Sequence, residues 1–283
     1  MRFYKYHGTG NDFIIIDAQG GEPLRPSEDI IDLCRRHTGI GADGVIFATH
    51  ASQGFDAGMR IFNADGGEAE MCGNGIRCLA KYLYERKGLV KDTMIIETVA
   101  GPRKLRLEVE RGRVTEVEVE MGVPEFAADN LPPINEPTQP GVLKLTIESG
   151  EQLPAVCLSM GNPHCVLFVE DTKNAPVVEI GPQVERHHQF PDRVNVGFAQ
   201  LVSPHHLLLR VWERGVGETA ACGTGACAAF VAAVHTSRGE SPMRVRLPGG
   251  ELRLKEGENG HVFLAGQVVE IFVAELGPFW RGE

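Results

Sequence analysis

Apolar residues in this chain fall into short runs separated by turns rich in glycine, proline and asparagine. Some runs are continuously apolar and others alternate with polar positions, and both patterns at this length are typical of β-strands. Strands are therefore expected to outnumber helices. The expected strands are 3–6, 13–17, 45–48, 59–62, 94–98, 105–109, 114–121, 142–147, 156–160, 165–169, 207–212 and 268–273.

Three segments show helical spacing instead. Ser27, followed by acidic residues, is expected to cap a first helix that ends at Gly39. A second helix is expected to follow Cys72 and to stop at Gly88. A third, around residues 226–234, is apolar on all sides and should be buried on every side.

The segment around Cys72 recurs 150 residues later around Cys222. A second match, at an offset of 151, pairs the turn before residue 13 with the turn before residue 164. Because the period is about half of the chain, the repeat is a domain rather than a solenoid unit. The first match aligns Arg60, Gly67, Glu68, Cys72, Gly73 and Gly75 with Arg210, Gly217, Glu218, Cys222, Gly223 and Gly225, and the second aligns Gly10-Asn11 with Gly161-Asn162.

The repeat predicts an α+β fold of two equivalent domains, each a mixed or antiparallel sheet wrapped as a barrel round a central helix. We expect the first domain to cover residues 1–120, completed by a C-terminal strand at about 266–283, and the second to cover 121–265. The proline-rich stretch 124–141 has almost no periodicity and is the expected connection between the domains. Turns at 248–250 and 259–260 are expected to form hairpins.

Composition narrows the possible partners. The 283 residues are 42% apolar and 23% charged, with a net charge of −10 and no block of lysine and arginine. Nucleic acid and an anionic membrane surface are therefore not expected as partners. The first residues lack the apolar segment of a signal peptide, and no window approaches the roughly 18 apolar residues of a membrane span, so a cytoplasmic protein is expected.

Two of the seven cysteines are candidates for chemistry. Cys72 and Cys222 each begin an expected helix and each precede Gly-x-Gly, where backbone N–H groups can face an anion and favour a thiolate. Two symmetric thiols suit removal of a proton from one face of a carbon and delivery of a proton to the other. The odd number makes a disulfide framework unexpected, zinc-ligand spacings and a Cys-x-x-Cys pair are absent, and buried structural thiols are expected at Cys34, Cys157, Cys165 and Cys227.

Residue chemistry alone leaves the roles of three further segments undecided. His164 follows the repeated Gly-Asn turn and could be a core histidine, although its place in the repeat favours a role in the site. Glu213 and Arg214, after an expected strand, could form an exposed ion pair or could hold an ammonium and a carboxylate. His187-His188 is expected to be solvated.

Together these segments resemble the diaminopimelate epimerase family over nearly the whole chain. Cys-Gly-x-Gly alone would be unspecific, whereas the combination is highly specific. The resemblance rests on residues 7–13, 62–66, 71–75, 160–165, 193–195, 212–215 and 221–225, which read HGTGNDF, FNADG, MCGNG, MGNPHC, RVN, WERG and ACGTG.

The resemblance implies interconversion of L,L- and meso-diaminopimelate without a cofactor or a metal, by a homodimer. It implies that Cys72 and Cys222 are the two bases, supported by His164 and Glu213. In relatives of this kind a glutamine can occupy the position of Gly44, and the C-terminal tyrosine that aids dimerisation is here Phe272. The resemblance assigns the carboxylate at the reacting carbon to Asn74, Gly73, Gly223 and Thr224, the distal carboxylate to Asn63, Asn162, Asn195 and Arg214, the distal ammonium to Glu213, and the lining of the site to Asn11.

Three alternatives stay open. Proline racemases and hydroxyproline epimerases share paired cysteines, but they typically carry histidine where this chain has Asn74. A two-lobed amino-acid-binding module would not need two thiols. A thiol redox sensor would use the same cysteines as a reversible disulfide.

Overall fold

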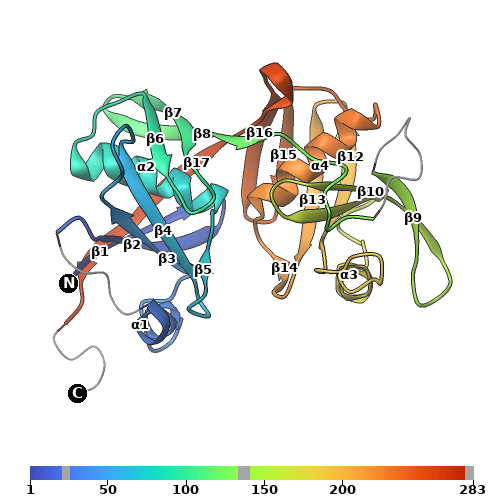
Figure 1. Ribbon diagram of the computed structural model, residues 1–283, viewed down its shortest axis with the longest axis horizontal. Coiled ribbons are helices and arrows are strands. Elements are labelled where there is room, and N and C mark those ends of the chain that lie inside the picture. The colour runs from blue at the N-terminus through green and yellow to red at the C-terminus, as the bar shows by residue number, and fades with distance from the viewer. Residues whose placement is uncertain (21–25, 133–140, 278–283) are drawn as a thin grey trace. The chain divides into compact units, whose positions relative to one another are not determined.

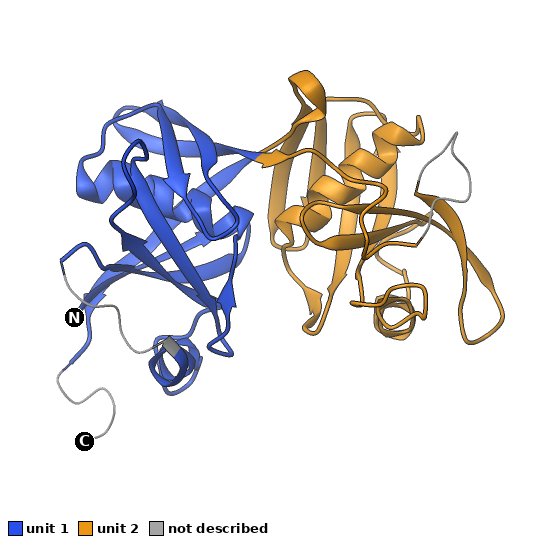
Figure 2. Ribbon diagram, in the orientation of Figure 1, with its two compact units in different colours: residues 1–120, 265–283 blue, residues 121–264 orange. Residues whose placement is uncertain are grey.

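The computed structural model describes residues 1–20, 26–132 and 141–277. It divides the chain into two compact units (Figures 1 and 2). The first unit contains Met1–Glu120 together with Ala265–Glu283, and the second contains Met121–Leu264. The last strand of the chain therefore returns to the first unit.

A mixed sheet and two helices form the first unit. Its strands are neighbours in the order β17, β1, β2, β3, β4, β6, β7 and β8, and β8 also pairs with β17, which closes the sheet. The short β5 is added to β4, and the pairs β2/β3 and β4/β6 are parallel. The elements are β1 (Arg2–Gly8), β2 (Asn11–Asp17), α1 (Pro26–Cys34), β3 (Gly44–Thr49), β4 (Ala57–Asn63), β5 (Glu68–Ala69), α2 (Gly73–Lys87), β6 (Thr93–Glu97), β7 (Arg103–Glu110), β8 (Arg113–Gly122) and the end of β17 (Val262–Glu275).

Both faces of this sheet are covered. The helix α2 packs against β1, β2, β3, β4 and β7, so the sheet curves around it. On the other face, α1 buries a cluster that includes Ile14, Ile16 and Ile30. Ile15 lies between two residues of that cluster and is fully buried as well. Burial on two faces explains why residues 13–16 are continuously apolar rather than alternating.

The second unit repeats this plan. Its strand order is β9, β10, β11, β12, β13, β15 and β16, with β14 added to β13, and the parallel pairs are β11/β12 and β13/β15. The elements are β9 (Val142–Thr146), β10 (Gln152–Ser159), β11 (Pro163–Phe168), α3 (Val177–Glu185), β12 (Asn195–Ser203), β13 (His206–Glu213), β14 (Gly217–Thr219), α4 (Gly223–His235), β15 (Met243–Leu247), β16 (Gly250–Glu256) and a 3₁₀ turn (Glu258–Gly260).

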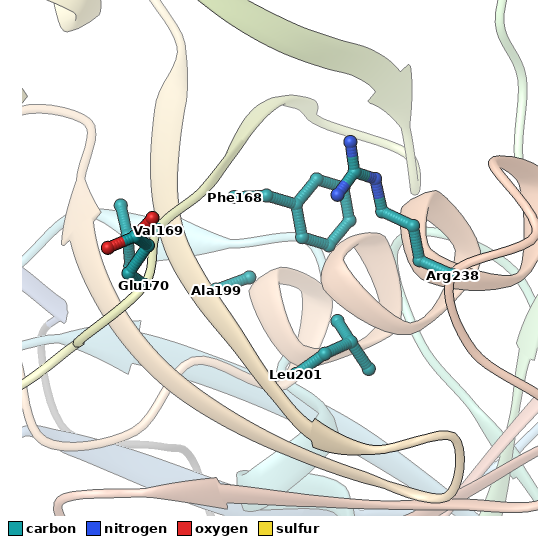
Figure 3. Close-up of a pocket in the computed structure, with 6 residues that line it drawn as sticks. All are labelled: Phe168, Val169, Glu170, Ala199, Leu201 and Arg238. Carbon is teal, nitrogen blue, oxygen red and sulfur yellow. The ribbon is translucent and has the colours of Figure 1, made fainter.

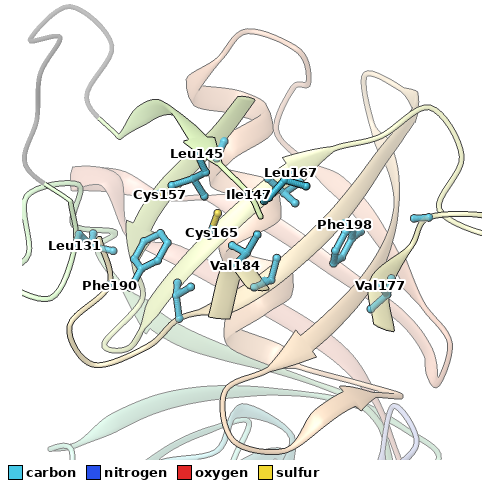
Figure 4. Close-up of a cluster of buried hydrophobic side chains, with 14 residues drawn as sticks. Leu131, Leu145, Ile147, Cys157, Cys165, Leu167, Val177, Val184, Phe190 and Phe198 are labelled. Carbon is cyan, nitrogen blue, oxygen red and sulfur yellow. The ribbon is translucent and has the colours of Figure 1, made fainter. Parts of the chain in front are cut away.

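The helix α4 is the central helix of the second unit. It contacts β10, β11, β12, β13, β15 and β16, and Gly223 and the residues from Gly225 to Ala233 are buried. On the opposite face of the sheet, α3 contributes Val177 and Val184 to a second apolar cluster, which also holds Cys157, Cys165 and Phe198 (Figure 4). The prediction of an α4 buried on every side is confirmed.

An ion pair marks the duplication at the level of side chains. In the first unit the Arg60 guanidinium donates to the Glu68 carboxylate at 2.7 Å across β4 and β5. In the second unit Arg210 donates to Glu218 at 2.6 Å across β13 and β14. The expected fold class is confirmed: two equivalent units, each with a mixed sheet curved around one helix.

Several local expectations need correction. The helix α1 begins at Pro26, so Ser27 lies inside the helix rather than at its cap, since proline is well suited to the first helical position. The helix also ends at Cys34, before Gly39. The division between units falls after Glu120, so the proline-rich stretch belongs to the second unit where it is described; residues 133–140 lie outside the described part.

The turns near the end of the chain behave differently from each other. Pro248-Gly249 joins β15 and β16 as a hairpin, as expected. Asn259-Gly260 lies in a 3₁₀ turn that joins the neighbouring strands β16 and β17, and the Gly257 N–H donates to the His261 carbonyl at 2.8 Å across it. Among the described residues, no helix has both the length and the apolar character needed to cross a membrane.

Candidate functional site

Each of the two candidate cysteines is the N-cap of a central helix. Cys72 has extended backbone angles before α2, and its sulfur accepts a hydrogen bond from the Gly75 N–H at 3.4 Å. Cys222 has the same extended conformation before α4. A helix N-terminus presents unpaired N–H groups and a partial positive charge, and both favour an anion at this place.

Glycine at the third helical position keeps room beside each sulfur. A Cβ at Gly225 would lie 3.2 Å from the Cys222 sulfur, closer than nearly all real contacts of this kind. A Cβ at Gly75 would lie 2.9 Å from the Ile61 side chain and 3.5 Å from the Cys72 Cβ. The Gly-x-Gly pattern therefore lets each helix start pack close to the sheet with its thiol at the end of the helix.

In the first unit, candidate residues lie at strand ends near one another in the sheet. Asn11 is the first residue of β2, Gly44 the first of β3, and Asn63 the last of β4. Gly44 pairs directly with Asn63, and residue 13 of β2 pairs with Gly44. The parallel β2/β3 pair thus places its amino-terminal end beside the carboxyl-terminal end of β4.

The second unit places equivalent residues at the equivalent strand ends. Asn162 directly precedes β11, Asn195 begins β12 and Glu213 ends β13. His164 of β11 pairs with Asn195 of β12. By the repeat offsets, Asn195 occupies the place that Gly44 has in the first unit. A Cβ at Gly44 would lie 2.6 Å from the Phe62 carbonyl oxygen, so this strand end is tighter in the first unit.

Two side-chain amides adjoin Cys72. Asn11 Oδ1 lies 3.9 Å from the Cys72 sulfur, which can donate to it as a thiol, and it accepts from Asn74 Nδ2 at 3.3 Å. Asn74 is 2% exposed. Because its side chain is hydrogen-bonded inside the unit, Asn74 can offer a ligand its backbone more readily than its amide.

Electrostatics around Cys222 favour the protonated thiol. Burial raises the pKa of the Cys222 thiol well above its ordinary value, and the Glu213 carboxylate raises it further. The Thr224 hydroxyl, 3.7 Å from the sulfur, acts in the opposite direction. The Glu213 carboxylate also accepts a hydrogen bond from the Thr219 hydroxyl. These surroundings therefore favour the protonated form of the Cys222 thiol.

His164 is buried in the second unit and neutral. Burial, and secondarily the Arg214 charge, lower its pKa to about 3. Its Nε2 lies 2.9 Å from Asn162 Oδ1, and since that oxygen accepts, Nε2 carries the proton. His164 is 1% exposed, so it fixes Asn162 from inside the sheet.

The segment with Glu213 and Arg214 is held by buried polar groups. Asn195 accepts from the Arg214 N–H at 3.0 Å and donates to the Pro163 carbonyl at 3.0 Å. The Glu185 carboxylate of α3 accepts from the Trp212 indole at 2.7 Å and from the Gly215 N–H at 3.0 Å. Burial opposes its ionisation, but these donors keep the pKa of Glu185 below its ordinary value.

The structure distributes the candidates between the units and adds residues that the sequence did not single out. Arg77 and Glu185 belong to no motif used in the sequence analysis, and they stand out only because the structure buries their charged side chains.

Among the predicted site residues, Asn63 and Arg214 have exposed side chains. The first unit holds Asn11, Asn63, Cys72, Gly73 and Asn74; the second holds Asn162, His164, Asn195, Glu213, Arg214, Cys222, Gly223 and Thr224.

A pocket of about 350 Å³ lies elsewhere in the second unit (Figure 3). Phe168 and Leu201 line it at the carboxyl-terminal ends of β11 and β12, with Arg238 stacked over the Phe168 ring at 4.8 Å. His164 and Asn195 lie toward the amino-terminal ends of the same strands, so this pocket contains none of the candidate residues. Within residues 1–20, 26–132 and 141–277, no group of three His, Cys, Asp or Glu side chains could hold a metal ion.

Solved structures with this fold define the class to which the molecule belongs. A probable proline racemase from Agrobacterium radiobacter superposes with a TM-score of 0.71 at 15% identity, covering 99% of this chain and 95% of that one. A PhzF-family phenazine biosynthesis protein from Bacillus anthracis superposes with a TM-score of 0.68 at 20% identity, covering 98% and 99%. The protein therefore shares its fold with these two proteins.

Sequence comparison identifies the family within that class. The family model for diaminopimelate epimerase matches residues 3–127 and 156–271. Diaminopimelate epimerases from Synechococcus elongatus and Moorella thermoacetica are 47% and 46% identical to the chain; the matches cover 98% and 96% of this chain and 98% of each relative. The chain belongs to the diaminopimelate epimerase family.

Proposed function

We propose that the protein interconverts L,L- and meso-diaminopimelate, with Cys72 and Cys222 as the two acid–base groups. The observation that carries this proposal is the duplicated half-site: each unit offers one cysteine thiol at the N-terminus of its central helix. A stereocentre is inverted when one group takes a proton from one face and another group delivers a proton to the opposite face. One thiol in each of two equivalent units suits that task.

The chemistry needs one thiolate and one thiol at a time. The thiolate takes the Cα proton and becomes a thiol, while the electron pair of the C–H bond remains on the carbon. The opposite thiol then donates its proton to that carbon and becomes the thiolate. In the free protein we assign the thiol to Cys222, because burial and Glu213 raise its pKa. The reverse reaction exchanges the two roles.

Backbone N–H groups at the helix starts would hold the carboxylate next to the reacting carbon. Gly73 and Asn74 begin α2, and Gly223 and Thr224 begin α4, so both helices present N–H groups there. These donors would also stabilise the charge that develops as the proton leaves Cα. This mechanism uses the chain's own residues and requires neither a metal nor a cofactor.

The distal end of the substrate carries an ammonium and a second carboxylate. We assign the ammonium to the Glu213 carboxylate and the carboxylate to Arg214 with Asn63, Asn162 and Asn195. Asn195 would act by holding the Arg214 backbone, since its own amide is engaged on both sides. Binding energy from this end would favour exclusion of water from the reacting carbon.

A homodimer is the second part of the proposal. The final strand β17 exposes Val269, Ile271 and Phe272, which are between 42% and 49% exposed. A bulge in the pairing with β1 places Ile271 opposite no residue, so Ile271 and Phe272 both face outward. An exposed apolar group of this kind suits contact with a second copy of the chain.

The function is tested by proton exchange in D₂O. With reductant present and no added cofactor, deuterium should appear at Cα of L,L-diaminopimelate together with the meso isomer. Cys72→Ala and Cys222→Ala should each abolish this inversion and remain folded; full activity in either variant contradicts the two-thiol mechanism. Exchange into proline or hydroxyproline instead would keep the mechanism and change the substrate, and no exchange with any amino acid would favour a binding module.

A further inference from the structure

Two side-chain amides beside Cys72 lie in a hydrogen-bonded series with charged ends. The Arg77 guanidinium donates to Asn74 Oδ1 at 2.5 Å, and Asn74 Nδ2 donates to Asn11 Oδ1 at 3.3 Å. Asn11 Nδ2 then donates to the Asp43 carboxylate at 2.6 Å. A guanidinium can only donate and a carboxylate can only accept. The two ends of the series therefore fix which way both amides point.

We infer that Arg77 and Asp43 are positioning residues for Cys72, because they hold Asn11 with its oxygen toward the sulfur. The inference rests on the proposed acid–base role of Cys72. An acceptor 3.9 Å from the sulfur favours the protonated thiol, whereas the Gly75 N–H at 3.4 Å favours the thiolate. The direction of the Asn11 amide thus sets the balance between the two forms that the reaction uses.

Both ends of the series are anchored. Arg77 is fully buried, and its guanidinium also donates to the Thr9 hydroxyl at 3.1 Å and to the Gly73 carbonyl at 3.1 Å. It thereby ties the turn between β1 and β2 to the first residues of α2. At the other end, Asp43 accepts from the Arg36 guanidinium at 2.6 Å. Neither amide can rotate without breaking a bond to one of these charged groups.

The second unit has no equivalent of this series. At the repeat offsets, Cys227 stands in place of Arg77 and Val194 in place of Asp43. Both replacements are buried and apolar. Cys222 in the same molecule is therefore an internal control for any change that acts through the amide series.

Asp43→Asn is the decisive variant. An asparagine at this place can donate or accept, so Asn11 Nδ2 loses its obligatory acceptor and turning the Asn11 amide then breaks only the 3.3 Å bond from Asn74 Nδ2. One negative charge is also lost. Both changes favour the thiolate. We expect the pH dependence of Cys72 alkylation by iodoacetamide to move to lower pH by about half a unit to one unit, a roughly three- to tenfold faster reaction below the midpoint. Alkylation of Cys222, followed by peptide mass spectrometry, should be unchanged.

Two comparisons separate orientation from charge. Asp65→Asn removes an exposed carboxylate from the turn after β4 in the same unit, and it should leave the Cys72 profile in place. The Asp43→Asn shift should also persist in about 1 M salt, which screens exposed charges but does not turn an amide. An equal shift in Asp65→Asn, a shift that vanishes in salt, or no shift at all would overturn the inference.

Arg77→Gln tests the other end. The inference expects that release of both amides moves the Cys72 profile to lower pH, as in Asp43→Asn, whereas loss of the buried cation alone would move it to higher pH. A shift to higher pH would therefore contradict the inference. If this variant does not fold, Asp43→Asn still decides the question, because the Asp43 side chain is 39% exposed. Alkylation needs no substrate, so failure of wild-type protein to epimerise diaminopimelate would contradict the proposed function and leave the thiol result standing.

Discussion

His164 shows how a single buried residue couples this fold to pH. Its pKa is 6.5 in an unfolded chain and about 3 in the folded protein, because burial disfavours the charged ring. Between these values the unfolded chain binds a proton that the folded protein does not. Stability from this group is therefore complete above about pH 6.5 and falls by roughly 1.4 kcal/mol per pH unit as the pH drops toward 3.

His164→Gln should remove that dependence, because the glutamine amide can still donate to Asn162 and does not titrate. We expect the free energy of unfolding in urea, measured from pH 7 to pH 4, to fall less steeply in the variant. The difference in slope should correspond to one proton, about 1.4 kcal/mol per pH unit. Equal slopes in the two proteins would show that His164 is protonated in the folded state.

Single residues could be predicted from the sequence where a reactive side chain lies in a repeated motif. Residues whose importance comes from partners far away in the sequence could not. Cys72 and Cys222 stand out because the motif recurs. Arg77 looks like any polar helix residue, and its hydrogen-bond partner Thr9 lies 68 positions away in the sequence. Glu185 is similar, since it ends the helix α3 whereas its partner Trp212 belongs to the strand β13. The roles of the candidate site residues remain predictions.

At the scale of elements, the two arginines of the duplicated ion pair differ in how many groups they bind. Arg60 pairs with Glu68, whereas Arg210 pairs with Glu218 and also caps the loop before α3. There its Nη1 donates to the carbonyl oxygens of Thr172, Lys173 and Ala175 at 2.9, 3.4 and 3.1 Å.

Arg210→Gln should therefore be more destabilising than Arg60→Gln. Loss of a partly exposed ion pair costs less than about 1 kcal/mol, and the carbonyl oxygens deprived of a charged donor should add about 1–3 kcal/mol for Arg210. Urea unfolding of the two matched variants measures the difference. Equal losses would mean that water replaces Arg210 at those carbonyls without cost.

Elements with strong local signals could be predicted, and those shaped by packing could not. The helix α2 begins after Cys72 and ends at Gly88, whose φ of 71° favours glycine. The helix α3 was not expected, because Gly181 and Pro182 interrupt its pattern. Gly181 is needed there since a Cβ would lie 2.7 Å from the Trp212 ring, a contact visible only in the fold.

For the whole molecule, β17 provides a test of the proposed dimer. Ile271→Glu should place a charge in the contact and shift the protein from dimer to monomer in sedimentation velocity at micromolar concentration. Val178→Glu is the matched control, since Val178 is a 61% exposed valine on α3. A monomeric wild-type protein, or a variant that remains dimeric, would contradict pairing through this strand.

The fold class could be predicted because duplication is visible in the sequence: a motif that recurs after half the chain implies two similar units. The continuous apolar runs, by contrast, do not reveal which strands are parallel. The β2/β3 and β11/β12 pairs run parallel because α1 and α3 cross between them, and α3 was not recognised.

The return of β17 gives the two units different histories during synthesis. The second unit is one uninterrupted stretch, so all its strands leave the ribosome before the first unit receives its last one. Until residues 268–275 emerge, β1 has β2 on one side and an open edge of unpaired backbone groups on the other. The unit that is synthesised first is thus completed last. A nascent chain stalled before β17 would expose the unpaired edge of β1, to which chaperones could bind.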